Sequence, residues 1–195
     1  MISKAGCRQL FNGRDLAGWQ MVGRGRFSVQ DGLLVTEGGM GLLWYSEAKI
    51  GNCRLRVVFR VGRPEDNSGV FIRIEERPAD VWYAVHHGYE VQILATADQW
   101  RRTGCIYSMT RAPAGVQRPP EEWNTMDITM DGLRTTVTLN DTLVTTLDPD
   151  QPLPPPQFDY DPKRGPRPEY GYIGLQNHDG DSVVAFREVT VSRLP

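Results

Sequence analysis

YEVQIL, residues Tyr89–Leu94, is the stretch of this sequence that says most about its fold. Side chains alternate between the two faces of a β-strand, so residues two apart share a face. In this stretch Tyr89, Val91 and Ile93 take one face, while Glu90 and Gln92 take the other. The pattern predicts a strand with one buried face and one face that carries hydrogen-bonding groups.

Two further stretches repeat this arrangement. They are VFIRI, residues Val70–Ile74, and YIGLQNH, residues Tyr172–His178. Arg73 opposes Val70, Ile72 and Ile74 in the first stretch. In the second stretch, Gln176 and His178 oppose Ile173 and Leu175. An ordinary exposed sheet face carries a loose mixture of Lys, Thr, Ser and Glu. The sequence therefore predicts that the three strands form the floor of one polar groove, lined by Arg73, Glu90, Gln92, Gln176 and His178.

Most of the remaining chain also reads as short strands separated by turn residues. The predicted strands are Arg26–Val29, Leu33–Thr36, Arg54–Val61, Met126–Met130, Arg134–Leu139, Leu143–Leu147 and Val183–Val191. Helical periodicity is scarce, and Pro119–Trp123 alone suits one short helical turn. Many short strands with Gly, Pro, Asn and Asp at the turns predict an all-β sandwich or barrel.

The proline-rich segment Pro149–Pro168 cannot be a central strand, because proline lacks the donor that a sheet requires. It is too rigid and too aromatic for a plain linker. We predict a long ordered loop that leads into Tyr172–His178. No internal repeat or domain boundary stands out, and 195 residues suit one domain over 1–195.

Charge and hydropathy narrow the possible partners. A net charge of −2 and the lack of a strongly basic window argue against nucleic acid as a partner. No run approaches the ~18 apolar residues of a membrane span, so we expect no membrane partner. No leader is visible at the N-terminus, and the three widely spaced cysteines suit reduced thiols. These features favour the cytoplasm, with a mature exported form left open.

An ordered set of motifs gives the chain a family resemblance. The set runs from FNGRDL at Phe11–Leu16, through NSGVFIR at Asn67–Arg73 and GYEVQIL at Gly88–Leu94, to GYIGLQNH at Gly171–His178. Each motif is weak alone, but their order over nearly the whole chain is specific. The chain resembles the 3-keto-disaccharide hydrolase (DUF1080) family. Asn177, where the family commonly has an acidic residue, is a departure that bears on the edge of the site.

The resemblance implies a concanavalin A-like jelly-roll β-sandwich of two antiparallel sheets, with a carbohydrate site on the concave sheet. Members of the family are linked to cleavage of glycosides that are already oxidised to a ketone at C3. The implied substrate is a small carbohydrate, namely an oxidised glycoside or disaccharide. The oligomeric state does not follow from the sequence.

The residues themselves suit that chemistry better than ordinary glycoside hydrolysis. Conventional glycosidases need two carboxyl groups, and this strand offers Glu90 alone. A 3-keto group acidifies the hydrogen on C2, so one base can drive elimination of the C1 substituent and water can add back. We expect Glu90 or His178 as the base, His178 as a possible acid, and Arg73 as the stabiliser of the enolate oxygen. Groups expected to bind substrate are Asn67, Gln92, Gln176, Tyr107, Trp82 and Trp100.

Several alternatives stay open at this point. Glu90 and Arg73 could form a structural cross-strand ion pair. A divalent metal could replace Arg73 as the electrophile, with ligands from His86, His87, Glu90 and His178, although no dense ligand spacing is present and no cofactor is certain. The same groove could serve a non-catalytic, lectin-like carbohydrate-binding module, or the polar face could be a solvated sheet surface.

Overall fold

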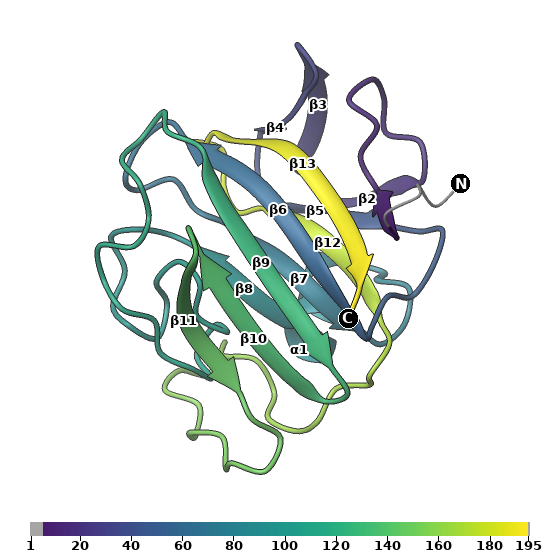
Figure 1. Ribbon diagram of the computed structural model, residues 1–195. Coiled ribbons are helices and arrows are strands. Elements are labelled where there is room, and N and C mark those ends of the chain that lie inside the picture. Colours follow the sequence, from purple (N-terminus) through teal and green to yellow (C-terminus); the bar gives the residue numbers. More distant parts are fainter. Residues whose placement is uncertain (1–5, 195) are drawn as a thin grey trace.

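The computed structural model describes residues 6–194 and consists of two antiparallel β-sheets packed face to face (Figure 1). One sheet has the order β11-β10-β9-β6-β13-β4-β3, with β1 paired to β13; the other has the order β2-β5-β12-β7-β8. The fold is therefore an all-β sandwich, as predicted. The strands of the larger sheet are β1 (Cys7–Gln9), β3 (Arg26–Gln30), β4 (Leu33–Glu37), β6 (Cys53–Val61), β9 (Asn124–Asp131), β10 (Arg134–Leu139), β11 (Thr142–Leu147) and β13 (Val184–Arg193).

The smaller sheet carries all three stretches that the sequence singled out. Its strands are β2 (Trp19–Gly23), β5 (Gly41–Tyr45), β7 (Ser68–Ile74), β8 (Tyr89–Ile93) and β12 (Tyr172–Asn177). Strand β7 lies between β12 and β8, so the three stretches are direct neighbours. Every predicted strand is present to within two residues at each end, whereas β1, β2 and β5 were not predicted.

The main core fills the space between the sheets. Alternate residues of β6, such as Leu55, Val57 and Phe59, are fully buried there and face the inward residues of the smaller sheet. The outer face of the smaller sheet carries a second apolar cluster, which includes Leu42, Phe71 and residues of the one helix found among residues 6–194. The smaller sheet is therefore covered on both faces at one end.

That helix, α1 (Val81–His87), was not predicted. Asp80 caps its N-terminus by accepting a hydrogen bond from the Tyr83 backbone N–H at 2.8 Å, and Val81, Ala84 and Val85 are buried. The cap and the i, i+3, i+4 spacing were readable, but seven residues make too short a window for periodicity to stand out. By contrast, Pro119–Trp123 forms a turn and no helix.

A β-bulge at Arg73 breaks the alternation in β7. Tyr172 pairs with Ile74 and Gly174 pairs with Phe71, so β7 carries one residue more than β12 over this interval. Arg73 has a φ of 54°, in the left-handed region that non-glycine residues rarely adopt. Residues beyond the bulge change faces, and Ile74 joins Phe71 in the outer cluster instead of the main core. The predicted common face of Arg73 and Glu90 is therefore wrong.

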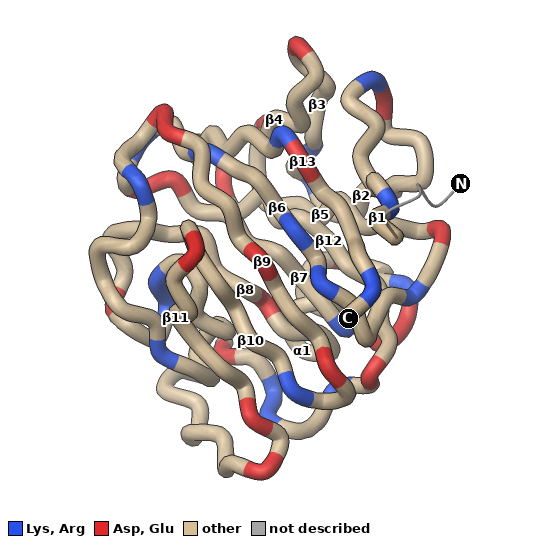
Figure 2. Tube along the Cα trace, viewed as in Figure 1, with Lys and Arg blue, Asp and Glu red and all other residues tan. Residues whose placement is uncertain are grey.

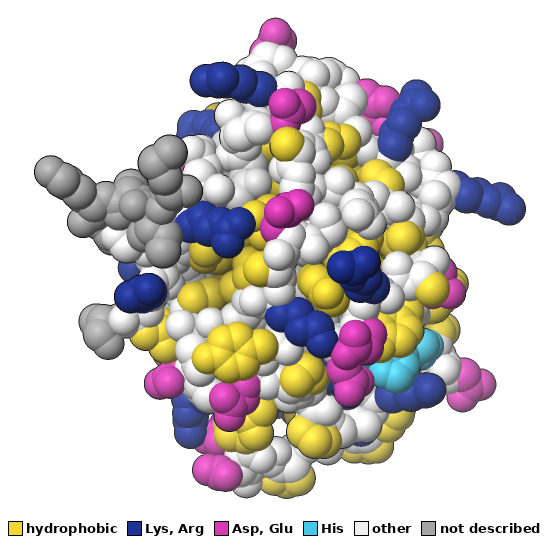
Figure 3. Space-filling view, turned by 90° about the vertical axis from the view of Figure 1, so that its right-hand side faces the viewer, with side chains coloured by type: hydrophobic (Ala, Val, Ile, Leu, Met, Phe, Trp, Pro, Cys, Tyr) yellow, Lys and Arg dark blue, Asp and Glu magenta, His cyan; other side chains and the backbone are white. Residues whose placement is uncertain are grey.

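Charged residues of both signs are distributed over the described part of the chain (Figure 2). Figure 2 shows Lys and Arg interspersed with Asp and Glu along strands and loops. On the face drawn in Figure 3, hydrophobic side chains form small patches interrupted by charged ones. No helix within residues 6–194 has the length and apolar character needed to cross a membrane.

Candidate active site

The polar residues of β8 and β12 lie on the outer face of the smaller sheet. Strand pairing places Gly69 of β7 opposite Gln92 of β8, and Leu175 of β12 opposite Val70 of β7. Gln176 and Gln92 therefore lie on either side of Gly69. Glu90, two residues before Gln92 in β8, lies on the same face of the sheet. All three polar side chains line a cavity of about 230 Å³. The complete lining is Met40, Asn67, Trp82, Val85, Glu90, Gln92, Leu94, Ala97, Arg101, Tyr107, Tyr160, Gln176 and His178.

The segment Thr103–Tyr107 extends this floor beyond the edge strand. The Gln92 N–H donates to Cys105 O at 3.0 Å, and the Tyr107 N–H donates to Glu90 O at 2.9 Å. Ile106 bridges to Val91 and faces the main core with it. Tyr107 therefore points to the opposite face, beside Glu90 and into the cavity.

Glu90 is a buried carboxyl group without a partner. Its side chain is 8% exposed and makes no ion pair or side-chain hydrogen bond within residues 6–194. Gly69 leaves it room, because a Cβ atom there would lie 2.4 Å from the Glu90 Oε1 atom. Burial raises the pKa of Glu90 to about 8. The alternative of a structural Glu90–Arg73 ion pair is therefore wrong, and Glu90 can hold or release a proton near neutral pH.

Amide groups around Glu90 also have unused hydrogen-bonding capacity. Gln176 is 2% exposed, and its Oε1 atom has no partner in the described part of the chain; the same holds for Oδ1 of Asn67. Gln92 is 3% exposed and uses its Oε1 atom to accept from the Ile93 N–H at 3.2 Å. Buried polar groups normally have partners, so these atoms indicate a ligand with several hydroxyl groups.

His178 lies at the rim of the cavity. Its side chain is 45% exposed, and its Nδ1 atom is 3.0 Å from Oδ2 of Asp179. Although burial opposes the shift, hydrogen bonds from His178 and Ser182 lower the pKa of Asp179. Asp179 is thus an ionised partner that orients the ring and leaves Nε2 available to a ligand.

The walls come from α1 and from two loops. Trp82 projects from α1 and is 51% exposed, and Tyr160 of the proline-rich loop is 54% exposed. Tyr160 stacks on Phe158 with ring centroids 5.1 Å apart. Arg101, which the sequence did not single out, supplies the one Lys or Arg side chain in the lining. No local motif marks Arg101, because its place depends on how its loop meets the loop that carries Tyr160.

Two predicted site residues lie elsewhere. Arg73 is fully buried, and its guanidinium donates to the carbonyl oxygens of Pro168, Glu169, Gly132 and Arg134 and to Thr135 Oγ1. It anchors the end of the proline-rich loop and does not reach the cavity. Trp100 lines a different, shallow hollow, where the Arg111 guanidinium lies 4.6 Å from the centroid of its ring. Asn177 is also no site-edge residue, since it is buried and its Nδ2 donates to Glu37 O of the larger sheet at 2.7 Å.

The candidate metal ligands are not brought together. His86 and His87 lie on α1, where they stack on Trp82 and Tyr83 respectively. Neither histidine lines the cavity that holds Glu90 and His178. Within residues 6–194, no group of three or more His, Cys, Asp or Glu side chains is placed to hold a metal ion.

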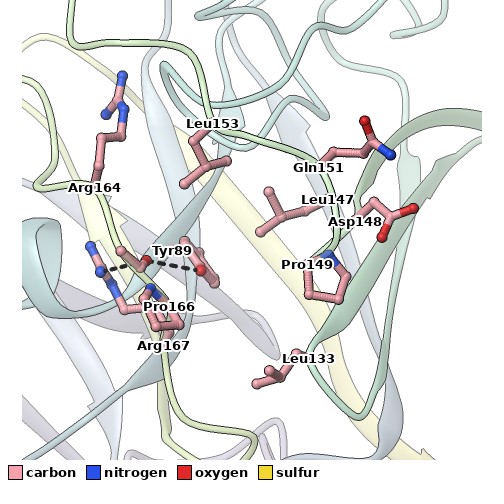
Figure 4. Close-up of a pocket in the computed structure, with 11 residues that line it drawn as sticks. Tyr89, Leu133, Leu147, Asp148, Pro149, Gln151, Leu153, Arg164, Pro166 and Arg167 are labelled. Atoms are coloured by element: carbon pink, nitrogen blue, oxygen red, sulfur yellow. Dashed lines mark hydrogen bonds between the residues drawn. The ribbon is translucent and has the colours of Figure 1, made fainter.

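A larger cavity of about 450 Å³ lies between the proline-rich loop and the β10–β11 end of the larger sheet (Figure 4). Leucine, proline and tyrosine side chains border it, and Figure 4 shows the guanidinium groups of Arg164 and Arg167 directed away from its middle. Both guanidiniums donate to backbone carbonyls of the loop, including Pro154 O and Gly165 O. The Gly165 carbonyl also accepts from the Tyr89 hydroxyl at 3.4 Å. Asp148 and Gln151 also border this cavity, and Asp148 is paired with Arg134. The unpartnered buried oxygens of Gln176 and Asn67 lie at the smaller cavity, so we assign the candidate site to the smaller cavity.

Comparison with known proteins assigns the chain to a family. The 3-keto-alpha-glucoside-1,2-lyase-like domain matches residues 6–192 of the chain. The chain belongs to this family. The family resemblance predicted from the motifs is therefore confirmed, and the match covers both sheets of the sandwich.

Solved structures of relatives share the fold of this family member. One is a glycosyl hydrolase candidate from Parabacteroides distasonis, with 26% sequence identity and a TM-score of 0.78. The match covers 96% of this chain and 99% of the other chain. Another is the carbohydrate-binding module CBM66 from Bacillus subtilis, with 15% sequence identity and a TM-score of 0.62. The match covers 90% of this chain and 95% of the other chain. No protein with a curated description matches the sequence. The family match and the glycosyl hydrolase candidate support a carbohydrate-related function, and both structures support a jelly-roll β-sandwich.

Proposed function

We propose that this protein cleaves 3-keto-glycosides by removing the proton on C2, eliminating the C1 substituent and adding water. The observation that carries the proposal is Glu90, a lone buried carboxyl group in a cavity lined with hydrogen-bonding amides. The family match and the glycosyl hydrolase candidate of similar structure support an oxidised carbohydrate as the substrate. The small cavity suits about one sugar ring, below the ~300 Å³ of typical drug-sized pockets.

The first step is proton transfer to Glu90. The carboxylate takes the hydrogen from C2, the C–H electron pair forms a C2–C3 double bond, and the ketone oxygen becomes an enolate. A base with a pKa near 8 is stronger than an ordinary carboxylate, which helps it to remove a weakly acidic C–H proton. Gln92, Gln176 and Asn67 position the sugar through its hydroxyl groups.

The second step expels the leaving group. The enolate re-forms the C3 ketone, the electron pair shifts to form a C1–C2 double bond, and the C1–O bond breaks. His178, oriented by Asp179, donates a proton to the departing oxygen. Water then adds its hydroxyl to C1 and a proton to C2. The sum is hydrolysis, which gives a 3-keto sugar and the free alcohol.

The direct test is release of 3-keto-glucose from 3-keto-trehalose or 3-keto-lactose. We expect Glu90→Gln to lower the rate of release about 10²–10⁴-fold, because the amide cannot accept the proton. The amide should keep the substrate bound, since shape and the hydrogen-bonding neighbours are retained. Glu65→Gln, at an exposed position, is the matched control. A folded Glu90→Gln variant with parental activity would exclude Glu90 as the base.

The pH dependence identifies the role of Glu90. As the base, Glu90 must be ionised, and only about a tenth of the free protein meets this condition at pH 7. We therefore expect the rate of C2 proton removal, followed by exchange of the C2 hydrogen with solvent and independent of the His178 acid, to rise with pH up to about 8 and then level off. A rate that falls through the same range would make Glu90 the acid and leave the base role to His178. Tight sugar binding without turnover of any 3-keto-glycoside would favour the lectin-like alternative.

A further inference from the structure

Because Arg73 lies outside the cavity, the proposed reaction still needs a residue that stabilises the enolate oxygen. Removing a proton next to a ketone places negative charge on the ketone oxygen, and a hydrogen-bond donor must meet that charge. The oxygen lies on the carbon adjacent to the one that loses its proton. The group that donates a hydrogen bond to the ketone oxygen must therefore come from a side chain adjacent to the base.

Tyr107 meets this geometric requirement. Its N–H bonds to Glu90 O at 2.9 Å, so the two residues are neighbours across the edge of the sheet. Neighbouring side chains on one face of a sheet have Cβ atoms about 5 Å apart. Both side chains line the cavity, and Glu90 has no charged or hydrogen-bonding partner of its own within residues 6–194. A ketone can therefore present its C–H to Glu90 and its oxygen to the Tyr107 hydroxyl.

Arg101 lies next to Tyr107 and lines the same cavity. Its guanidinium carbon is 5.8 Å from the Tyr107 ring centroid and 4.5 Å from that of Phe158. Its Nη1 atom donates to Asp98 Oδ2 and to Gln157 Oε1, each at 3.1 Å. The cation is therefore held between two loops and two aromatic rings, next to the phenol.

The charges around the phenol act in opposite directions. Burial raises the pKa of the Tyr107 hydroxyl, and the adjacent Arg101 cation opposes that rise. The Glu90 carboxylate also acts on the phenol in the direction of a raised pKa, and so does Asp161, whose Oδ1 atom is 3.6 Å from Nη2 of Arg101. The hydroxyl thus stays protonated, as a donor must, while the nearby cation polarises it.

We propose that the Tyr107 hydroxyl is a catalytic residue that donates a hydrogen bond to the enolate oxygen, and that Arg101 is its positioning residue. The inference rests on the proposed function, and no covalent bond to Tyr107 forms or breaks. It implies that the protein acts on a carbonyl compound with an adjacent C–H bond and leaves an unoxidised glycoside uncleaved.

The test uses two reactions of the full chain. One is release of 3-keto-glucose from 3-keto-trehalose, and the other is hydrogen–deuterium exchange at C2 of 3-keto-glucose in D2O, which needs no leaving group. We expect Tyr107→Phe to lower kcat for release and the exchange rate by about 10²–10³-fold with KM changed less than about threefold. Tyr170→Phe is the matched control, because Tyr170 is exposed and bonds to Asn52 outside the cavity.

Arg101→Gln gives a second measurement that leaves the phenol in place. We expect about a tenfold loss in kcat and in exchange, because the phenol loses the adjacent cation. Should Tyr107→Phe and Arg101→Gln both retain parental exchange and release, the inference is wrong while the proposed function stands. If the parent protein shows neither reaction with any 3-keto-glycoside, the proposed function fails and this inference fails with it. Melting curves confirm that each variant is folded.

Discussion

At the scale of single residues, the proposed chemistry depends on Glu90, a buried carboxyl group without a partner in the described part of the chain. A buried carboxylate is unfavourable unless it is paired, so the neutral form of Glu90 dominates at neutral pH. The unpaired oxygens of Gln176 and Asn67 add to the polar groups that only a ligand can satisfy. Such groups reduce the stability of the free protein, which is typical of active sites.

The burial of Glu90 predicts a stability that depends on pH. Its pKa is about 8 in the folded chain and 4.5 ordinarily, so between these values the folded state holds a proton that the unfolded state has lost. Stability from this group is complete below pH 4.5 and is lost as pH rises through 8. We expect Glu90→Gln to melt higher than the parent at pH 8, with the difference shrinking towards pH 5.

Melting curves of both proteins from pH 5 to pH 9 provide this measurement. The free-energy difference at pH 8 should reach a few kcal/mol. Glu65→Gln, at the surface, should follow the parent at every pH. A constant difference between Glu90→Gln and the parent would contradict a raised pKa in the folded state.

At the scale of elements, three adjacent strands, β12, β7 and β8, form the floor of the site. The middle strand, β7, has a glycine where a larger side chain would collide with Glu90. Gly69 of β7 lies between Gln176 and Gln92, and Glu90 occupies the volume that a side chain at position 69 would fill. Gly69 is the second residue of β7, which begins at Ser68 of the NSG sequence. Strand β7 therefore contributes to the site by lacking a side chain at one position.

Gly69→Ala tests this role of β7. The new methyl group would lie 2.4 Å from Glu90 Oε1, so the carboxyl group must move. We expect kcat to fall at least about tenfold while the protein still folds, since a displacement of a catalytic group by about 1 Å is costly. Gly39→Ala, where the nearest atom is 3.8 Å away, is the control. Equal activity of the two variants would show that Glu90 does not react from its present position.

At the scale of the whole molecule, the proline-rich loop joins the two sheets and closes one side of the cavity. Arg73 of the smaller sheet donates to Gly132 O and Arg134 O near the β9–β10 turn, and to Pro168 O and Glu169 O of the loop. Asp161 holds the middle of the loop by accepting from Ser108 Oγ at 2.8 Å and from the Gln157 N–H at 2.7 Å. Tyr160, next to Asp161, is thereby placed at the cavity wall.

The variant Arg73→Met tests whether Arg73 stabilises the fold without taking part in catalysis. The variant leaves several buried carbonyl groups without donors, so we expect the free energy of unfolding to fall by about 3 kcal/mol. Because Arg73 lies outside the cavity, kcat should stay within about threefold of the parent at temperatures where the variant is folded. Urea unfolding and steady-state rates measure the two effects, with the exposed Arg14→Met as control. A selective loss of kcat without loss of stability would restore Arg73 to the mechanism.

The sequence alone determined all the strands except β1, β2 and β5, the apolar and polar faces of β8 and β12, and the family. These follow from a two-residue period and from ordered motifs, which are local properties of the chain. It also placed Glu90, Gln92 and Gln176 on one surface, because β8 and β12 alternate without interruption.

Only the tertiary structure decided which cation serves the cavity. The bulge turns Arg73 away because the proline-rich loop offers carbonyl groups from far along the chain, and those contacts hold its left-handed backbone. Arg101 reaches the cavity because its loop meets Gln157 and Phe158, more than fifty residues later. Contacts between segments so distant in sequence leave no periodic signal, so folding alone brings these groups together.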